Sequence, residues 1–304
     1  MQNARNRRIA ERETGNMKDH NYDLHRKGEV CWLTFPQFDR YPELSHLFTT
    51  RRGGVSTGEL ESWNFGKCQK ESAENILKNY EILARTLGTE TKKMVRSNQT
   101  HTANILEVDE RHLGMGIIRD RSYEDIDGLV TDRTGITLIT THGDCNPLYF
   151  YDPAGCVIGL AHSGWRGTLG EIAGEMIERM ERRYGCRPSD ILAGIGPGLC
   201  QDCFEVDEDV ADLFYEKHSS WRQFGKSRSN AGEGIGAGRK HYLDLKAVIR
   251  WTLTSSGVLP DHIFDMKLCT RCNPDLFFSY RGQKGRNGNM AAAMMLRPYH
   301  HRNK

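Results

Sequence analysis

Between residues 128 and 268, short apolar runs alternate with segments that carry apolar residues at helical spacing. The runs are rich in valine, isoleucine and leucine, which is typical of partly buried strands. The predicted strands are residues 128–132, 136–141, 147–152, 156–162, 190–196 and 262–268. Elements that alternate in this way pack as layers, with helices covering the faces of a sheet. The sequence therefore predicts an α/β (α+β) fold in which helices cover mixed sheets.

Start and stop signals mark the predicted helices. Glycine after the last apolar position is a common helix end, and Thr168 followed by Glu171 has the spacing of a capping box. The predicted helices run from Ser72 to Gly88, from Thr168 to Gly185, through residues 206–214 and from Asp244 to Gly257.

The chain is expected to form a single layered domain over residues 29–297. No linker rich in proline, glycine or serine divides this range, although residues 225–239 have the composition of a mobile loop. Residues 1–28 are polar and are predicted to be a flexible extension, with a short helix over Ile9–Glu13 as the alternative. Residues 298–304 are expected to be a solvated tail.

Composition excludes several classes of protein. The net charge of +2, from 42 basic and 40 acidic residues, gives no reason to expect nucleic acid or a membrane as the main partner. No apolar run has the length of a transmembrane helix, and the N-terminus lacks the apolar segment of a secretory signal. Nine cysteines without an export signal favour reduced thiols in a cytoplasmic protein.

Three segments between residues 98 and 167 carry the residue types that bind zinc. They are NQTH ending at His101, THGDCNP around Cys145, and AHSGWRG around His162. Three histidine or cysteine ligands from separate elements leave a fourth position for water or substrate, as in a catalytic zinc site. Each residue alone also fits an ordinary structural role, so the prediction depends on all three lying together.

The segment after His162 has the composition of an anion-binding turn. Gly164, Arg166 and Gly167 follow the predicted strand directly and precede a predicted helix. Backbone amides at such a turn can bind phosphate or carboxylate, and Arg166 can add a fork of donors. An ordinary strand–helix turn is the alternative, and the pattern is not that of a P-loop.

Long motifs from residue 46 to residue 296 resemble the YfiH family, also called the laccase-domain or polyphenol-oxidase family. The motifs are HLFTTRRGGVSTGELESWNFG (46–66), NQTH (98–101), DGLVTD (127–132), GDCNPLYFYDP (143–153), AHSGWRGT (161–168), GIGPGLCQDCFEVDEDV (194–210) and LCTRCNPDLFFSYR (268–281). The resemblance covers nearly all of the predicted domain, and it implies a YfiH-like layered fold.

The resemblance implies one zinc ion bound by His101, Cys145 and His162. It also implies phosphorolysis of adenosine, inosine, guanosine and methylthioadenosine, together with adenosine deamination. Purine nucleosides and phosphate would then be the partners of the chain. Arg51 and Asn64 match family motifs that approach the same pocket.

Two positions depart from the family pattern. Gly143 replaces the alanine that usually precedes the Asp-Cys pair, which is a mild change. Asn289 follows Gly288 where the family often has arginine, and Arg286 lies nearby. The role of that arginine is therefore in doubt for this chain.

Asp144 precedes the cysteine ligand directly, so it is a candidate to orient a ligand imidazole or to act as a general base. A structural turn aspartate is the alternative. In phosphorolysis, phosphate would attack the ribose C1′, with Arg51, Arg166 and the loop amides as phosphate donors. In deamination, zinc would activate a water nucleophile.

Two other enzyme classes stay open, and a non-enzymatic binding module is the least favoured class. A copper-dependent polyphenol oxidase is disfavoured because no His-x-His pair is present among the 12 histidines. A cysteine hydrolase or amidase would use Cys145 as nucleophile and His162 as base, and would fit the peptidoglycan-editing name that some family members carry.

Two CxxC pairs are not part of the predicted zinc site. They are Cys200 with Cys203 and Cys269 with Cys272. Four such cysteines can form a structural zinc site, but the gap between the pairs is far longer than in a zinc ribbon. Reduced buried thiols are the favoured interpretation from sequence, and a second zinc is the alternative.

Overall fold

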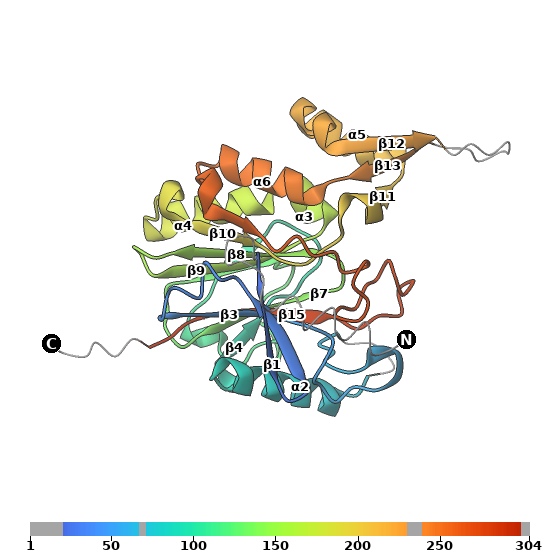
Figure 1. Cartoon of the computed structure of the whole chain (residues 1–304). Helices are drawn as coiled ribbons and strands as arrows, with labels where there is room; N and C mark the ends of the chain where they lie inside the picture. The colour runs from blue at the N-terminus through green and yellow to red at the C-terminus, as the bar shows by residue number, and fades with distance from the viewer. Residues whose placement is uncertain (1–20, 67–70, 230–238, 299–304) are drawn as a thin grey trace.

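Two β-sheets stacked face to face form the centre of the molecule, and helices lie on both outer sides (Figure 1). The computed structural model describes residues 21–66, 71–229 and 239–298. The α/β (α+β) fold predicted from the alternation of apolar runs is confirmed. Within the described residues, no helix is both long enough and apolar enough to cross a membrane.

The first sheet contains six strands within the described part of the chain, and one of its two central strands is the last strand in sequence. In sheet order, the strands are β1 (Asp23–Lys27), β2 (Val30–Thr34), β3 (Leu44–Thr49), β15 (Met290–Leu296), β7 (Thr137–His142) and β4 (Met94–Arg96). Strand β15 pairs antiparallel with both β3 and β7, so the two ends of the domain meet in one sheet.

The second sheet also contains six strands within those ranges. In order they are β14 (Ile263–Asp265), β10 (Leu192–Ile195), β8 (Asn146–Asp152), β9 (Val157–Ser163), β6 (Gly128–Thr131) and β5 (Ile105–Glu107). Every strand predicted from sequence overlaps a strand of the two sheets, with ends that differ by a few residues.

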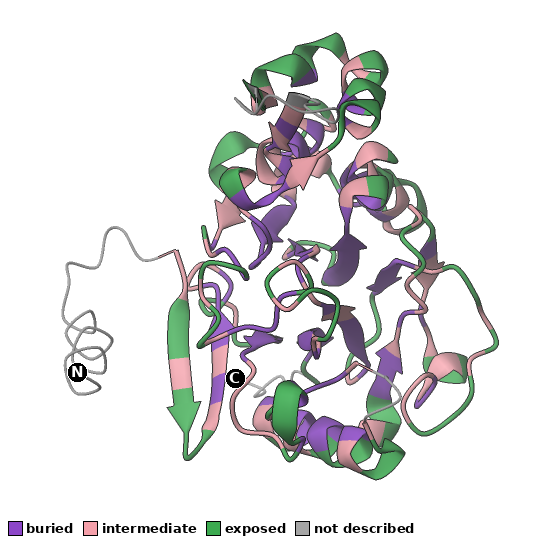
Figure 2. Ribbon diagram, turned by 90° about the vertical axis from the view of Figure 1, so that its right-hand side faces the viewer, coloured by how far each residue is buried: buried purple, intermediate pink, exposed green. Residues whose placement is uncertain are grey.

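Three apolar cores join these layers. One lies between the sheets and includes Phe48 and Leu160. The second packs the other face of the second sheet against helices α4 and α6, and the third packs the first sheet against α2. Figure 2 shows the buried residues concentrated in the strands, with exposed residues on the outer sides of the helices. The helices are α2 (Ala73–Leu87), α3 (Trp165–Leu169), α4 (Ile172–Tyr184), α5 (Glu208–Lys217) and α6 (Leu245–Ser255).

A smaller unit projects from the helical side of the second sheet (Figure 1). It contains α5 and a three-stranded sheet in the order β11 (Glu205–Val206), β13 (Arg239–Leu243) and β12 (Gly225–Ser229). Residues 225–239 are therefore not simply a mobile loop, because both ends of this range pair as antiparallel strands. Residues 230–238 lie outside the described residues.

Four further predictions need correction or fall outside the described residues. The predicted extension over residues 1–28 is wrong at its C-terminal end, because Asp23–Lys27 forms an edge strand against β2. The capping box is wrong, because Thr168 belongs to α3 and Glu171 caps α4 without a side-chain hydrogen bond. The predicted helix over Ile9–Glu13 and the tail from residue 299 lie outside the described residues.

The side chain of Asn79, on α2, forms hydrogen bonds with the loop over residues 55–64 that precedes this helix. Its fully buried amide donates to the Ser56 hydroxyl at 2.9 Å and to the Asn64 carbonyl at 2.8 Å, and its oxygen accepts from the Val55 amide at 2.9 Å. Backbone groups of this loop that lost their partners would stay buried, which costs free energy.

We expect Asn79→Ala to lower the free energy of unfolding by about 2–3 kcal/mol, because it leaves buried polar groups without partners. Chemical denaturation followed by circular dichroism measures this change. Lys78→Ala, on the exposed face of the same helix, is the matched control and should leave the denaturation midpoint unchanged. Equal midpoints for the two variants would contradict the role assigned to Asn79.

Candidate metal centre and active site

The register of the second sheet brings the predicted ligands to one end of the sheet. Strands β8 and β9 pair so that Asn146 faces Ser163 and Pro147 faces His162. Cys145, which precedes β8 directly, therefore lies beside the C-terminal end of β9. Strand β6 pairs Gly128 with Ala161, so the residue before Gly128 lies next to His162 in the same way. The loop that carries His101 leads into β5, the parallel neighbour of β6.

His101, Cys145 and His162 form one cluster, as predicted. Their ligand atoms all lie within 4.8 Å of one another, and the two imidazole centroids are 5.1 Å apart. His162 is buried, Cys145 is half-buried and His101 is exposed. The cluster is therefore closed on the side of the sheet and reaches solvent on the side of His101.

The buried carboxylate of Asp127 holds two of the three segments together. One oxygen accepts from His162 Nδ1 at 2.7 Å and from the His101 amide at 3.2 Å. The other accepts from the amides of Thr100 and Thr102 at 3.1 and 2.8 Å, and from the Thr102 hydroxyl at 2.9 Å. This arrangement leaves His162 Nε2 to face the cluster, because the carboxylate fixes the proton on Nδ1.

Sequence reasoning missed Asp127, and a usable signal was present. Asp127 is the first residue of the DGLVTD motif, directly before a buried apolar strand. Burial raises the pKa of this carboxyl, but the hydrogen bond and charge of His162 and the loop amides outweigh that effect and hold the pKa below its usual value. The group is therefore a carboxylate at neutral pH, and a buried charge of this kind requires partners such as these.

In the absence of metal, the cluster favours a thiolate beside an imidazolium. Burial raises the pKa of the Cys145 thiol, yet the charge of His162 and the hydrogen bonds from both histidines lower it to about 6. Burial lowers the pKa of His162, but Cys145 and Asp127 together raise it to about 9. A thiolate at neutral pH is the form that binds a metal ion or acts as a nucleophile.

A fourth residue, His142, packs against the cluster on its buried side. It was not predicted from sequence. Its ring is buried, with its centroid 5.3 Å from that of His162. Its Nδ1 donates to the Cys145 carbonyl at 3.1 Å, and its Nε2 bonds the Thr140 hydroxyl at 2.7 Å. Burial and the charge of His162 lower the pKa of His142 well below its usual value, so the ring stays neutral.

Gly164 leaves the space that a bound ion would need. A Cβ atom at this position would lie 2.9 Å from Cys145 Sγ and 2.9 Å from His101 Cδ2. Gly164 also precedes α3, a helix of only five residues, rather than a long capped helix. Arg166 is exposed on α3 and stacks on the Trp165 ring at 4.1 Å.

The Asp144 carboxylate bonds to a neighbouring loop rather than to a ligand imidazole, and its role as a general base stays a prediction. Its two carboxylate oxygens accept from the Thr270 hydroxyl and the Arg281 amide, both at 2.6 Å. Its backbone has φ of 97°, a left-handed conformation that is strained for a non-glycine residue. Asp144 therefore fixes the turn before Cys145, and Asp127 is the carboxylate that holds the imidazole.

Arg51 and Asn64 hold loops rather than joining the ligand cluster. Arg51 donates to the carbonyls of Glu61 and Pro274 at 3.0 and 3.1 Å, and its guanidinium lies over the Phe278 ring. The buried Asn64 oxygen accepts from the amides of Gly66 and Asn289 at 2.8 and 2.9 Å. A substrate role for either residue stays a prediction.

The two departures from the family pattern now have a structural setting. A Cβ atom on Gly143 would lie 2.6 Å from the Asn287 amide nitrogen and 2.7 Å from the Asn289 amide oxygen. The segment that contains Asn289 therefore packs closely against the turn that leads to Cys145. Arg286 forms an ion pair with Glu59 at 3.7 Å, in the loop before α2.

Comparison with known proteins assigns the family. The family model described as "Multi-copper polyphenol oxidoreductase laccase" matches residues 45–297. The chain belongs to this laccase family. It is 35% identical over 247 residues to the purine nucleoside phosphorylase YlmD of Bacillus subtilis, a match that covers 80% of this chain and 85% of YlmD.

Other relatives carry different names. The protein named adenosine deaminase RL5, from an unknown prokaryotic organism, is 32% identical over 246 residues, with coverage of 80% of this chain and 91% of RL5. The crystal structure of the hypothetical protein YfiH of Bacillus licheniformis matches with a TM-score of 0.81 and 31% identity. That match covers 90% of this chain and 99% of YfiH.

The laccase family implies metal binding, and the cluster supplies suitable ligands. Two imidazoles and one thiolate suit zinc or copper, and the space beside Gly164 would admit an ion among them. Among the described residues, two other groups could hold a metal. They are the four cysteines Cys200, Cys203, Cys269 and Cys272, and the set of exposed Asp23, half-buried His25 and exposed Asp39.

We expect Asp127→Asn to weaken zinc binding at the cluster by about 10–100-fold, because His162 loses a charged partner and the His101 loop loses its anchor. Competition with a chelator of known affinity measures the change. Asp132→Asn, just beyond the end of β6 on the surface, is the matched control and should bind zinc as the native chain does. Unchanged affinity in Asp127→Asn would remove the role given to this carboxylate.

Proposed function

We propose that this laccase-family chain is a zinc-dependent purine nucleoside phosphorylase that acts on adenosine, inosine, guanosine and methylthioadenosine, and that also deaminates adenosine. The observation that carries the proposal is the cluster of His101, Cys145 and His162, which is closed on one side and open to solvent on the other. Three protein ligands with an open fourth position are the arrangement of catalytic zinc sites. Relatives named as purine nucleoside phosphorylases and as an adenosine deaminase support the choice of substrate.

Zinc fits the ligands better than a multi-copper centre does. A multi-copper oxidase would need several groups of histidines, whereas the described residues contain one group with two histidines. The absence of a His-x-His pair in the sequence agrees with this. Zinc has no redox chemistry, and it accepts a mixed set of nitrogen and sulfur ligands in a tetrahedral site.

In the proposed reaction, the side chains of the site would position the reactants and stabilise negative charge. In phosphorolysis a phosphate oxygen forms a bond to the ribose C1′, the bond from C1′ to the purine nitrogen breaks, and the purine leaves with the electron pair. Zinc, when bound, would stabilise negative charge and make water more acidic for deamination. Asp127 and His142 would keep the ligands in place, so that little reorganisation accompanies the reaction.

Arg166 is the side chain we assign to phosphate. It follows Gly164 by two residues, so it lies at the border of the cluster, and its exposed guanidinium forms no ion pair with any of the described residues. Stacking on Trp165 limits the conformations of the guanidinium without using its donors. The planar fork of donors suits a phosphate group.

We also place the protein in the cytoplasm. The eight described cysteines are all free, although several of them lie close together. Reduced thiols of this kind are typical of a reducing compartment.

A cysteine hydrolase is the second candidate, and one observation favours it. The Cys145 thiol lies beside His162, which in turn bonds the Asp127 carboxylate. The three groups could act as nucleophile, base and orienting carboxylate. The position of His101 within the same cluster favours metal binding, because a nucleophile–base pair needs no third ligand. The two candidates differ in their need for metal.

We expect the zinc-loaded protein to release hypoxanthine from inosine and adenine from adenosine only when phosphate is present. Deamination would appear as conversion of adenosine to inosine without phosphate. Cys145→Ser should abolish these reactions, because it removes a metal ligand. Chromatography of the products, with metal content measured on the same samples, tests this prediction.

Cys156→Ser is the matched control, since Cys156 is an exposed free cysteine outside the cluster. It should retain the activity and the metal content of the native chain. Nucleosides that stay intact with zinc-loaded protein would reject the proposed function. Activity of a metal-free sample, together with a covalent adduct on Cys145, would instead establish the cysteine hydrolase.

We expect Arg166→Ala to raise the KM for phosphate by about 10-fold or more, because a hydrogen-bonded charged partner is lost. The KM for inosine should change little. Steady-state kinetics with either substrate varied will separate the two effects. Arg222→Ala is the control, since Arg222 is also exposed and stacks on an aromatic ring, that of Tyr215, at 4.8 Å. Equal phosphate KM values in the two variants would show that Arg166 does not bind phosphate.

A further inference from the structure

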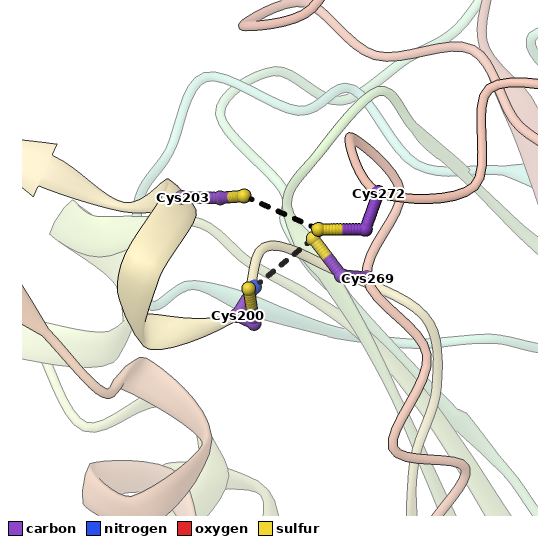
Figure 3. A group of neighbouring side chains, drawn as sticks. All are labelled: Cys200, Cys203, Cys269 and Cys272. Carbon is purple, nitrogen blue, oxygen red and sulfur yellow. Dashed lines mark hydrogen bonds between the residues drawn. The ribbon is translucent and has the colours of Figure 1, made fainter.

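The two CxxC pairs, which are far apart in sequence, meet in the folded chain. Figure 3 shows the sulfur atoms of Cys200 and Cys203 facing those of Cys269 and Cys272. In the first pair, Cys200 precedes a short 3-10 helix, Gln201–Cys203, and Cys203 ends it, while the second pair lies in the loop that follows β14. Sequence spacing argued against a joint site, because it could not show that the two loops are neighbours.

The distances suit one tetrahedral ion. The four sulfur atoms all lie within 4.8 Å of one another, and Cys203 Sγ is 3.5 Å from Cys272 Sγ. A zinc ion with Zn–S bonds of about 2.3 Å requires sulfur atoms about 3.8 Å apart. The four cysteines are free, so no disulfide competes for the sulfur atoms. Small shifts of the side chains would therefore complete the site.

Backbone contacts already join the two loops around the sulfur atoms. Gly198 and Cys269 form a parallel β-bridge, and the Thr270 amide donates to the Gly198 carbonyl at 3.1 Å. The Cys200 amide donates to Cys269 Sγ at 3.4 Å. Amide donors to a ligand sulfur stabilise its negative charge, which favours the thiolate that zinc requires.

Access and burial also fit a structural ion. Cys203 and Cys269 are buried, Cys200 is half-buried and Cys272 is exposed. A cavity of about 310 Å³ beside α6 is lined by one of the four cysteines, Cys200, together with residues such as Lys246 and Asp265. The exposed Cys272 gives an ion access to the cluster, while four sulfur ligands would leave no position for a substrate.

We propose that Cys200, Cys203, Cys269 and Cys272 bind a second, structural zinc ion. This site is independent of the proposed function, because none of its ligands belongs to the cluster of His101, Cys145 and His162. Binding releases the protons of the thiols and joins two loops whose ends lie in different parts of the chain.

The second ion would also support the first site. Both loops of the cysteine cluster contact Asp144, the residue before Cys145. The Thr270 hydroxyl donates to the Asp144 carboxylate at 2.6 Å, and the Leu199 amide donates to the Asp144 carbonyl at 3.2 Å. Zinc would therefore fix the two segments that hold this strained turn. Loss of the second ion should loosen Cys145 without removing any ligand of the first site.

Metal analysis of the full chain, expressed with zinc and purified under reducing conditions without chelator, tests the proposal. The native chain should hold about two zinc ions. The double variant Cys145→Ser with His162→Ala should keep about one, with a zinc X-ray absorption spectrum that shows only sulfur neighbours at about 2.3 Å. Cys272→Ser should lose one zinc equivalent, and Cys156→Ser should lose none.

The outcomes separate the two sites. A double variant that holds no zinc would overturn the second site, as would nitrogen neighbours in its spectrum or alkylation of all four thiols in the zinc-treated protein. If Cys272→Ser fails to fold, the double variant still decides, since its cysteine cluster is intact. A native chain with one zinc in a sulfur-only environment would support the second site and count against the proposed function.

Discussion

The candidate active site depends on one buried carboxylate. Burial of a charge is costly unless the charge is paired and hydrogen-bonded, and Asp127 receives five donors: three backbone amides, one hydroxyl and the His162 ring. These contacts set the tautomer of His162 and anchor the loop of His101. Because the two ligands share one partner, a shift of the carboxylate would move both of them. The third ligand, Cys145, is held separately, by strand register and by the contact of its carbonyl with His142.

Much of the fold could be predicted from local patterns, and the missed elements show where such patterns fail. Strands β6 to β10 are rich in branched apolar or aromatic residues, so their sequences alone indicate buried strands. Strand β15, with the sequence MAAAMML, consists of residues that favour helices. It is a strand because both faces are covered: Ala291 and Ala293 pack toward α2, while Ala292 and Met294 pack between the sheets. Strand β1 was missed because an edge strand with mostly exposed side chains has no apolar pattern to detect.

The site shows the same limit. Its three ligands were found from motifs, because histidine and cysteine beside small residues are unusual in sequence. The sequence leaves Asp144 open as an orienting group, a general base or a turn residue, and in the structure the carboxylate that bonds His162 is that of Asp127. The left-handed backbone at Asp144 turns that side chain toward Thr270 and Arg281, away from the imidazoles. No spacing rule predicts this, because the pairing of His162 with Asp127 follows from the register of β6 against β9.

The two sulfur-containing clusters of the chain differ in a way that matches different tasks. The first cluster has three candidate ligands. Gly164 beside them has no side chain, and His101 is exposed, so a fourth position stays open. The second has four sulfur atoms and joins two loops, so coordination by its own residues would be complete. The turn at Asp144 lies between them and is bonded to the loops of the second cluster while it carries a ligand of the first. A zinc ion at the four-cysteine cluster would therefore stabilise the strained turn at Asp144. That turn would then fix the position of Cys145 in the cluster with His101 and His162.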